Sequence, residues 1–272
     1  MTTRGGEPVL VGQLVPSVSL QAYHCTACDR DFAGPALRAP LPEPVDLPSC
    51  EVCRAERQAQ WDEARRQEER VERRDRLLVQ LDVPALFADA RFDTFHLHGS
   101  SSDRTTLLHA QRRAWEWVNL WPSIHAVQAW VGGPGTGKNH LLYAIARELV
   151  VEHLVSARVV NLSDLVRELR LGWRDTTGPS ESLVLDRYRA FGWLAIDEVS
   201  LHAFRGEPKQ HLYDVINHRL EQKRPTILTS NETPAALLDL LGPALVSRIN
   251  GSGGVVDFGD ADYRQRSRAG AA

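Results

Sequence analysis

GGPGTGKNH, residues 132–140, is the stretch of sequence that decides the fold. It fits the pattern G-x-x-x-x-G-K-[ST] at every place but the last, where Asn139 stands instead of serine or threonine. A strand-like apolar run, Val127–Val131, comes directly before it, and an amphipathic run typical of a helix follows. This order of strand, glycine-rich loop and helix is typical of a phosphate-binding loop, or P-loop, in an α/β fold. An ordinary glycine turn is the alternative interpretation.

The chemistry of nucleotide binding explains the composition of this loop. Glycines let the backbone curl so that N–H groups point at phosphate oxygens, while the helix offers its positive N-terminal end. Lys138 can then reach the β- and γ-phosphates. The sequence therefore predicts that ATP is bound by the following residues: Gly133, Pro134, Gly135, Thr136, Gly137, Lys138, Asn139 and His140.

Asn139 raises a question about hydrolysis. The serine or threonine hydroxyl that usually follows the lysine is a ligand of Mg²⁺. An asparagine carbonyl is also a hard oxygen ligand, but it lies one atom further from the backbone, and Mg²⁺ requires oxygens at about 2.1 Å in an octahedron. We predict ATP binding with Asn139 as a ligand of Mg²⁺, and the sequence leaves open whether Asn139 slows hydrolysis.

Polar residues follow two later apolar runs, at the strand ends where ligands gather in parallel sheets. Asp197 and Glu198 follow the run Phe191–Ile196, and Asn231 follows the run 225–230. We predict that Asp197 holds Mg²⁺, that Glu198 activates the attacking water, and that Asn231 orients this water near the γ-phosphate. The alternatives are a strand capped by solvated acids and, for Asn231, a turn or N-cap residue before the next helix.

All four cysteines fall in two Cys-x-x-Cys pairs, Cys25/Cys28 and Cys50/Cys53. This spacing is typical of a structural Zn²⁺ site, in which four thiolates at about 2.3 Å complete a tetrahedron and leave no open position. Disulfides are disfavoured because no secretory signal is visible and an ATPase points to the reducing cytosol. A redox Cys-x-x-Cys normally occurs once, beside a βαβ unit. We predict one zinc ion here and interpret the adjacent His24 as a surface residue or a support for the ligands.

Length and composition favour two domains. The chain has 272 residues, 43% of them hydrophobic, which is ordinary for a globular protein with a sizeable core. We predict a zinc-binding module over residues 1–56, a charged linker helix over 57–81, and an α/β ATPase domain over 82–272 with a parallel sheet between helices. The module is too small to fold by burial alone, which explains the metal. Residues 9–20 fail as a signal segment and no apolar run reaches 18 residues, so we expect a cytoplasmic protein without a membrane span.

The predicted linker helix is recognised by its charges. Residues 54–76 mix Arg with Glu and Asp and contain neither Pro nor Gly, which favours an exposed helix with ion pairs three or four residues apart. A thin apolar stripe runs along it, formed by Trp61, Ala64, Val71 and Leu78. Docking on a partner helix is one interpretation of this stripe, and a solvated linker is the other.

Taken together, these motifs resemble a known family. The P-loop, the two polar strand ends and the segments Val246–Ile249 and Asp262–Arg264 are similar to the AAA+ proteins of the DnaC/IstB group, which are helicase loaders and transposition helper ATPases of bacteria and phages. The resemblance covers residues 82–266 and includes the lead-in of the ATPase domain at 83–95. Some loaders carry the same GTGKNHL run, asparagine included, and this favours a loader over a transposition helper.

The resemblance implies a role for each site residue. It implies that Lys138 binds phosphate and that Asp197 holds the metal. It also implies that Glu198 is the general base and that Asn231 is the first sensor. Arg248 matches the arginine finger, which in this family acts on the ATP of a neighbouring subunit and neutralises charge on the transferring phosphoryl group. Arg264 matches the arginine of a terminal Tyr-Arg pair that senses nucleotide in its own subunit. A surface arginine and a basic tail are the respective alternatives.

Contacts with DNA must be local, because the net charge of −3 gives the whole protein no attraction for a polyanion. Arg167, Arg170 and Arg174 recur near helical spacing with Trp173 beside them, a combination that can grip phosphates and stack on a base. The corresponding region contacts single-stranded DNA in the family. A solvated helix face is the alternative.

The resemblance is strongest to a DnaC-type helicase loader. It implies an ATP-dependent homo-oligomer joined through Arg248, whose N-terminal part grips the replicative DNA helicase so that the helicase can be opened onto single-stranded DNA. The alternatives are an IstB-type transposition helper, an ATP-binding interaction protein with little hydrolysis, and a zinc-dependent DNA-binding regulator.

Overall fold

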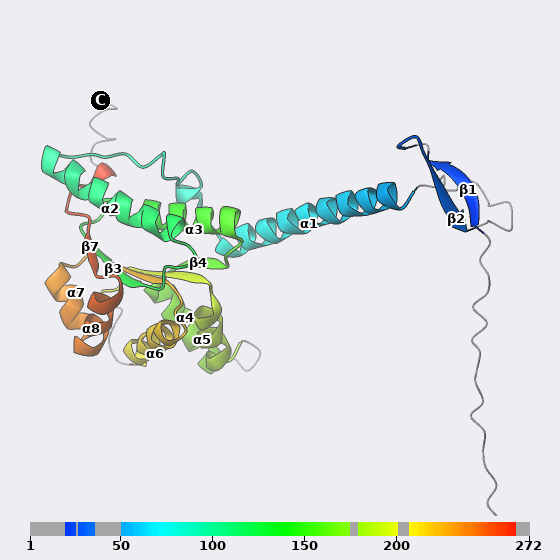
Figure 1. Ribbon diagram of the computed structural model, residues 1–272. Helices are drawn as coiled ribbons and strands as arrows, with labels where there is room; N and C mark the ends of the chain where they lie inside the picture. Colours follow the sequence, from blue (N-terminus) through cyan, green and yellow to red (C-terminus); the bar gives the residue numbers. More distant parts are fainter. Residues whose placement is uncertain (1–19, 26, 36–49, 175–178, 201–206, 265–272) are drawn as a thin grey trace, which may run out of the picture. The chain divides into compact units, whose positions relative to one another are not determined.

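The computed structural model describes residues 20–25, 27–35, 50–174, 179–200 and 207–264 (Figure 1). The chain divides into two compact units, Met1–Glu69 and Arg70–Ala272. Among the described helices, none combines the length and the apolar composition that crossing a bilayer requires.

The first unit contains a β-hairpin and the beginning of a long helix. Strands β1 (Leu20–Cys25) and β2 (Arg30–Pro35) pair antiparallel. Tyr23 lies opposite Phe32, and their rings stack with centroids 5.8 Å apart. Helix α1 (Glu51–Leu81) begins directly after Cys50. The hairpin and the helix start therefore carry the two cysteine pairs.

Helix α1 begins earlier than residue 57, where the linker helix was predicted to start. Glu51 lies in its first turn, where a carboxylate complements the positive end of the helix, and the N–H of Arg54 donates to the carbonyl of Cys50 at 3.0 Å. Cys53 consequently lies in the first helical turn, so the helix is part of the cysteine cluster. The division into domains at residues 56 and 81 stays a prediction.

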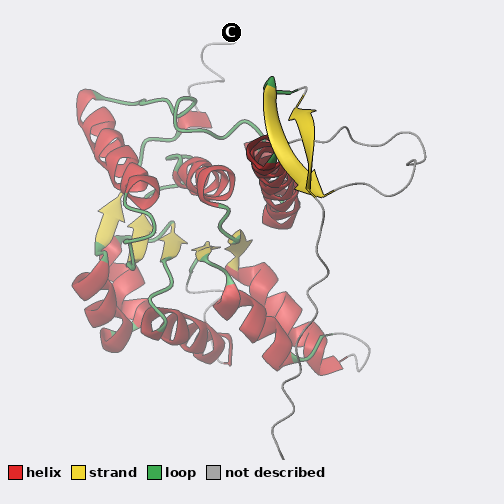
Figure 2. Cartoon of the chain, turned by 45° about the vertical axis from the view of Figure 1, so that its right-hand side comes forward, coloured by secondary structure: helices red, strands yellow, loops and turns green. Residues whose placement is uncertain are grey.

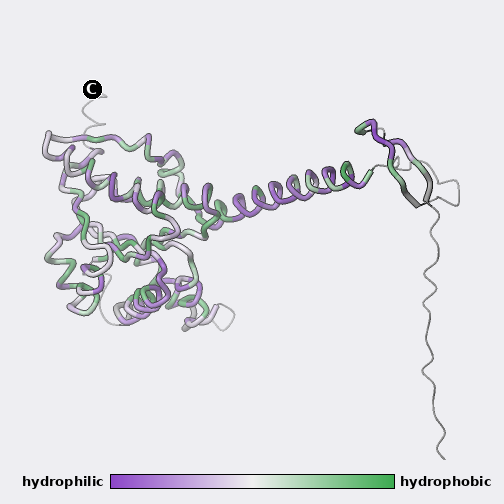
Figure 3. The backbone as a smooth tube through the Cα atoms, in the orientation of Figure 1, coloured by the Kyte–Doolittle hydropathy of each residue, from purple (hydrophilic) through white to green (hydrophobic). Residues whose placement is uncertain are grey.

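The predicted charge pattern of α1 appears as exposed ion pairs along the helix, such as Arg66–Glu63 at 2.7 Å and Arg76–Glu72 at 3.6 Å. Figure 3 shows the helix hydrophilic over most of its length. Trp61, from the predicted apolar stripe, is 65% exposed. Exposed pairs of this kind each contribute at most about 1 kcal/mol to stability, so α1 depends on helix propensity as much as on its charges.

The second unit is a five-stranded parallel sheet in the order β4-β5-β6-β3-β7. Its strands are β3 (Val127–Val131), β4 (Ala157–Asn161), β5 (Trp193–Asp197), β6 (Thr226–Ser230) and β7 (Val255–Asp257). Every residue of β3, β5 and β6 is buried, as expected for parallel strands covered on both faces. The predicted α/β fold, with a parallel sheet between helices, is confirmed.

Two layers of helices cover the sheet (Figure 2). Helices α2 and α3 pack with one core, while α4 to α8 pack with the other (Figure 1). The described helices after α1 are the 3₁₀-helix η1 (Ala85–Phe87), α2 (Ser101–Asn119), α3 (Lys138–His153), α4 (Leu162–Arg174), α5 (Glu181–Ala190), α6 (Glu207–Glu221), α7 (Pro234–Leu241) and α8 (Pro243–Ser252).

Polar side chains determine where helices begin. Ser100 caps α2 with a reciprocal capping box to Asp103, and Thr233 caps α7, whose first residue is Pro234. Asn231 is therefore not the N-cap of α7, which removes one alternative to its predicted role in the site.

Arg219 joins β5 and β6 at the ends where these two strands begin. Its buried guanidinium donates to the carbonyl oxygens of Phe191 at 2.6 Å and Pro225 at 2.7 Å, and to the hydroxyl of Thr226 at 2.8 Å. In the described part of the chain its partners are carbonyl and hydroxyl oxygens rather than a carboxylate, and burial lowers its pKa to about 9. Phe191 precedes β5 and Pro225 directly precedes β6, so Arg219 joins these two strands at the end opposite to their carboxyl ends.

Candidate functional site

The predicted P-loop connects β3 to α3 through glycines that no other residue could replace without strain. Gly135 and Gly137 have φ angles of 78° and 94°, in the left-handed region that favours glycine. A Cβ atom at Gly135 would lie 1.7 Å from Oδ1 of Asp262, and one at Gly137 would lie 2.6 Å from the ring of Phe95. The loop therefore needs glycine both for its curl and for the close approach of neighbouring segments.

Lys138 extends from the first residue of α3 back into the loop. Its ammonium donates to the carbonyl oxygens of Gly132 at 2.6 Å and Gly133 at 2.9 Å, and to Oδ1 of Asn231 at 2.9 Å. The side chain is only 6% exposed, and burial lowers its pKa to about 8. The ammonium thus lies at the centre of the loop, next to the polar end of β6.

The strand-end carboxylate and the P-loop asparagine are in direct contact. Asp197 is the last residue of β5, and its Oδ2 accepts a hydrogen bond from Nδ2 of Asn139 at 2.6 Å. Oδ1 of Asp197 accepts from the hydroxyl of Thr229 on β6. A carboxylate and an amide oxygen are donors that Mg²⁺ prefers, so this set of residues fits the metal. The role of Asn139 and Asp197 as magnesium ligands stays a prediction.

Glu198 follows β5 with its side chain exposed and its backbone at φ 58°. Its Oε2 accepts a hydrogen bond from Nδ2 of Asn161, the last residue of β4, while Oδ1 of Asn161 accepts from the N–H of Ser163 at 2.8 Å. These two bonds fix the orientation of the Asn161 amide. Our sequence interpretation missed Asn161, although it ends an apolar run, as Asp197 does, and that signal could have identified it.

The segment after β7 lies against the P-loop. The N–H of Tyr263 donates to the carbonyl of Gly135 at 3.0 Å, and Asp262 accepts from Nε of Arg264 at 3.1 Å. His98, which is buried, contacts the carbonyl of Ala261 through Nε2 at 2.8 Å. The terminal Tyr-Arg pair is thus held against the P-loop by backbone contacts.

A cavity of about 590 Å³ unites these elements. It is lined by the P-loop residues 134–140, by Asp197, Glu198 and Asn231, and by Arg264. The rest of the wall comes from the segment 86–98 and from the segment after β7, and the sequence interpretation did not assign these residues to the site: Leu86, Phe87, Asp89, Ala90, Thr94, Phe95, His96, His98 and Tyr263. A polar end and an apolar end in one cavity fit the phosphates and the base of a nucleotide.

Two groups of predicted residues lie outside this cavity. Arg248 is exposed on α8, where its guanidinium donates to Oδ1 of Asn217 on α6. Arg167 on α4 pairs with Asp164 at 2.8 Å, and Arg170 is exposed on the same helix. Arg174 is the last residue of α4, and the position of its side chain lies outside the described part of the chain. The structure leaves the predicted roles of these arginines untested.

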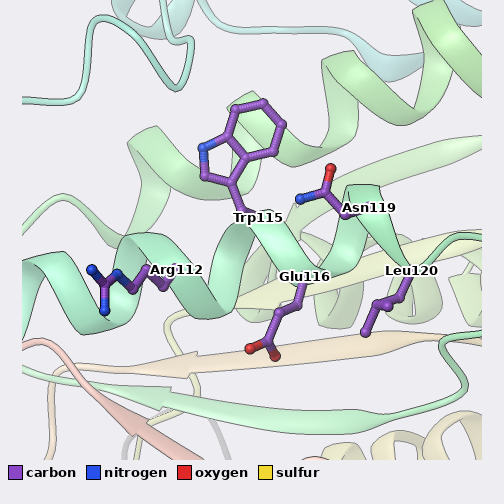
Figure 4. Close-up of a pocket in the computed structure, with 5 residues that line it drawn as sticks. All are labelled: Arg112, Trp115, Glu116, Asn119 and Leu120. Atoms are coloured by element: carbon purple, nitrogen blue, oxygen red, sulfur yellow. The ribbon is translucent and has the colours of Figure 1, made fainter.

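A second depression, of about 750 Å³, lies along α2 and is lined by Arg112, Trp115, Glu116, Asn119 and Leu120 (Figure 4). All five side chains come from one helix and its C-cap. None of them belongs to the predicted site, and the group presents no convergent set of phosphate-binding donors.

The four cysteine sulfurs lie within 4.8 Å of one another in the first unit. A tetrahedral Zn²⁺ ion with four thiolates places them roughly 3.8 Å apart, given the usual bond length of about 2.3 Å. All four cysteines are described, and none forms a disulfide. A backbone hydrogen bond from Cys50 lowers the pKa of the Cys25 thiol to about 6, whereas a hydrogen bond with Cys28 raises the pKa of the Cys53 thiol to about 12, so the case for a metal rests on the grouping of the sulfurs. The cluster could therefore bind zinc, as the sequence predicts.

Cys50→Ser is expected to abolish zinc binding, while the purified wild-type chain should carry about one Zn²⁺. A structural site couples the metal to local folding, so the β1–β2 hairpin should lose order and the second unit should keep its nucleotide binding. Elemental analysis and hydrogen exchange measure both effects. His24→Gln is the matched control, because His24 hydrogen-bonds to Asp29 and Asp31 and lies outside the sulfur cluster. A wild-type protein prepared without chelator and devoid of zinc would refute the prediction.

Comparisons with known proteins agree with this geometry. A family model described as IstB-like ATP binding protein matches residues 62–271. The replicative helicase loader DnaC of Buchnera aphidicola subsp. Schizaphis graminum is 27% identical over 195 residues, covering 71% of this chain and 76% of that protein. DnaC of Escherichia coli strain K12 is 28% identical over 160 residues, covering 58% and 64%. A crystal structure of the DnaC helicase loader matches with a TM-score of 0.55 and 19% identity, covering 64% of this chain and 99% of that chain.

The family model extends over most of the chain and includes the P-loop, the whole parallel sheet and the Tyr-Arg segment. The solved loader supports the fold alone, because its sequence identity is low. The resemblance to AAA+ proteins of the DnaC/IstB group is confirmed, and the chain belongs to the family of IstB-like ATP binding proteins.

Proposed function

We propose that this protein is an ATP-hydrolysing helicase loader that binds a replicative DNA helicase and helps to place it on single-stranded DNA. The observation that carries the proposal is the assembly of Lys138, Asp197, Glu198 and Asn231 around one cavity. The DnaC relatives are named as replicative helicase loaders, which favours a loader over a transposition helper. The chain spans 64% of the length of the Escherichia coli relative, so partners and activity belong to the proposal.

Each residue of the cavity has a chemical task in this proposal. The ammonium of Lys138 neutralises phosphate charge, and Asp197 with Asn139 holds Mg²⁺, which supplies further positive charge against the phosphates. Glu198 accepts the proton of the attacking water, while Asn231 positions that water. Asn161 holds one carboxylate oxygen of Glu198 and leaves the other for the water. The apolar wall around Phe95 and Tyr263 receives the base.

Arg248 is proposed to act on the ATP of a neighbouring subunit. It is exposed and lies outside the cavity of its own chain, as a finger supplied in trans would. The exposed arginines of α4 are proposed to contact single-stranded DNA, and the cysteine-bearing first unit is proposed to bind the helicase.

Helicase loading on a closed circle of single-stranded DNA tests the proposal. A circle has no free end onto which the helicase could thread by itself, so the helicase requires a loader. The full-length chain with ATP should allow its cognate replicative helicase to unwind an oligonucleotide annealed to the circle. Arg248→Ala should keep ATP affinity but lose turnover on the order of 10³-fold, and loading with it. Arg104→Ala, an exposed arginine on α2, is the matched control and should load normally. A chain that neither binds the helicase nor stimulates unwinding would overturn the loader function.

A further inference from the structure

Thr229 lies between two residues of the site without lining the cavity. It is the fourth residue of β6 and is fully buried. Its hydroxyl donates to Oδ1 of Asp197 and accepts a hydrogen bond from the backbone N–H of Glu198 at 3.3 Å. These roles are unambiguous, because a carboxylate only accepts and an N–H only donates. One side chain therefore contacts both consecutive acidic residues at the end of β5.

The hydrogen bond from Thr229 is one of two that hold the carboxylate of Asp197. Oδ1 accepts from Thr229 on β6, and Oδ2 accepts from Nδ2 of Asn139 on α3 at 2.6 Å. Two donors from different elements fix the plane of the carboxylate, while each oxygen keeps a further lone pair. Asp197 is only 8% exposed, so water cannot easily replace either donor. The group is thus oriented before any metal arrives.

The contact with Glu198 supports a strained backbone. Glu198 has φ 58°, in the left-handed region that residues other than glycine rarely adopt. The next residue, Val199, donates its N–H to the carbonyl of Thr229 at 2.8 Å and accepts from the hydroxyl of Ser230 at 2.6 Å. Side-chain and backbone atoms of β6 thereby hold the turn in which Glu198 leaves the sheet.

We propose that Thr229 is a positioning residue that sets the orientation of the metal-holding carboxylate of Asp197 and of the backbone of Glu198. This inference rests on the proposed ATPase function. Groups that hydrogen-bond to a metal ligand orient it, and their loss typically lowers metal affinity or activity by about 10- to 100-fold. Thr229 thus positions the metal ligand Asp197 and the general base Glu198 through hydrogen bonds, and it does not itself line the cavity.

Thr229→Val tests this role, because valine keeps the shape of threonine and removes only the hydroxyl. Binding of a fluorescent ATP analogue is measured in EDTA and across a titration with Mg²⁺. The valine variant should bind the analogue in EDTA as the wild type does, and should require about 10- to 100-fold more Mg²⁺ to reach full affinity. Thr229→Ser should restore the wild-type Mg²⁺ dependence, because serine offers the same hydroxyl.

Thr226→Val is the matched control on the same strand. Thr226 is also fully buried, and its hydroxyl bonds to Arg219 at the opposite end of β6. Its loss should lower the melting temperature and leave the Mg²⁺ dependence unchanged. A wild-type Mg²⁺ dependence in Thr229→Val would overturn the proposal. So would failure of both Thr229→Val and Thr229→Ala to fold, since the hydroxyl would then serve stability.

The Mg²⁺ titration requires no turnover, so its outcome is separate from that of the proposed function. A wild type that binds Mg²⁺ with the analogue but does not hydrolyse ATP contradicts the ATPase. A valine variant with unchanged Mg²⁺ dependence contradicts Thr229 alone.

Discussion

Replacing Lys138 by methionine is expected to weaken ATP binding by about 100-fold, or roughly 3 kcal/mol, because truncating one partner of a buried charge pair typically costs 2–5 kcal/mol. Methionine keeps the length and the apolar stem of lysine but lacks the ammonium that bonds to Gly132, Gly133 and Asn231. Calorimetric titration with ATP measures the loss. Arg104→Met, on the exposed surface of α2, is the matched control and should bind ATP like the wild type. Unchanged affinity in Lys138→Met would remove the lysine from the phosphate site.

The pH dependence of binding gives a second measurement on the same residue. Burial lowers the pKa of Lys138 to about 8, so in the unliganded protein the ammonium loses its proton as the pH rises through 8. Phosphates bind the charged form, and ATP affinity should therefore fall as the pH rises above 8. The Lys138→Met variant should lack this fall. A wild-type affinity that stays constant between pH 7 and roughly pH 10, the ordinary range of a lysine, would contradict the lowered pKa.

Glu198→Gln is expected to lower ATP turnover by about 10²- to 10⁴-fold, the usual contribution of a general base, with ATP affinity nearly unchanged. Glutamine can accept the hydrogen bond from Asn161 through its carbonyl oxygen, so the local geometry should persist. Single-turnover hydrolysis and equilibrium binding separate the two effects. Glu152→Gln, on an exposed turn of α3, serves as the control. Equal turnover by wild type and Glu198→Gln would remove the general-base assignment.

The parts of the site that the sequence predicted are those in which local pattern determines geometry. The P-loop could be recognised because its glycines, lysine and flanking elements are adjacent in the chain. Asp197 and Asn231 could be placed at the same edge because parallel strands bring their carboxyl ends together. The spacing within each Cys-x-x-Cys pair brings two sulfurs close without long-range information, and the meeting of the two pairs was predicted from the four-cysteine zinc motif as a whole.

The parts that escaped prediction depend on strand order and on packing. The end of an apolar run marks Asn161 as a candidate residue, but its contact with Glu198 depends on β4 lying next to β5, which the local sequence does not show. His98 and Tyr263 meet at the cavity although they are distant in the chain. The helix start at Glu51 was missed because the second cysteine pair was assigned to the zinc-binding module, which was placed before the helix, whereas helix-forming residues surround Cys53.

The position of β3 within the sheet has a consequence for the synthesis of the protein. Strand β3, which carries the P-loop, pairs only with β6 and β7 among the described strands, and both follow it in the chain. In a nascent chain, Val127–Val131 therefore has no described strand partner until β6 has left the ribosome. Pairings between such distant segments form slowly and leave unpaired edges open to aggregation. The strand pairs that flank the P-loop strand consequently form only after β6 and β7 have been synthesised.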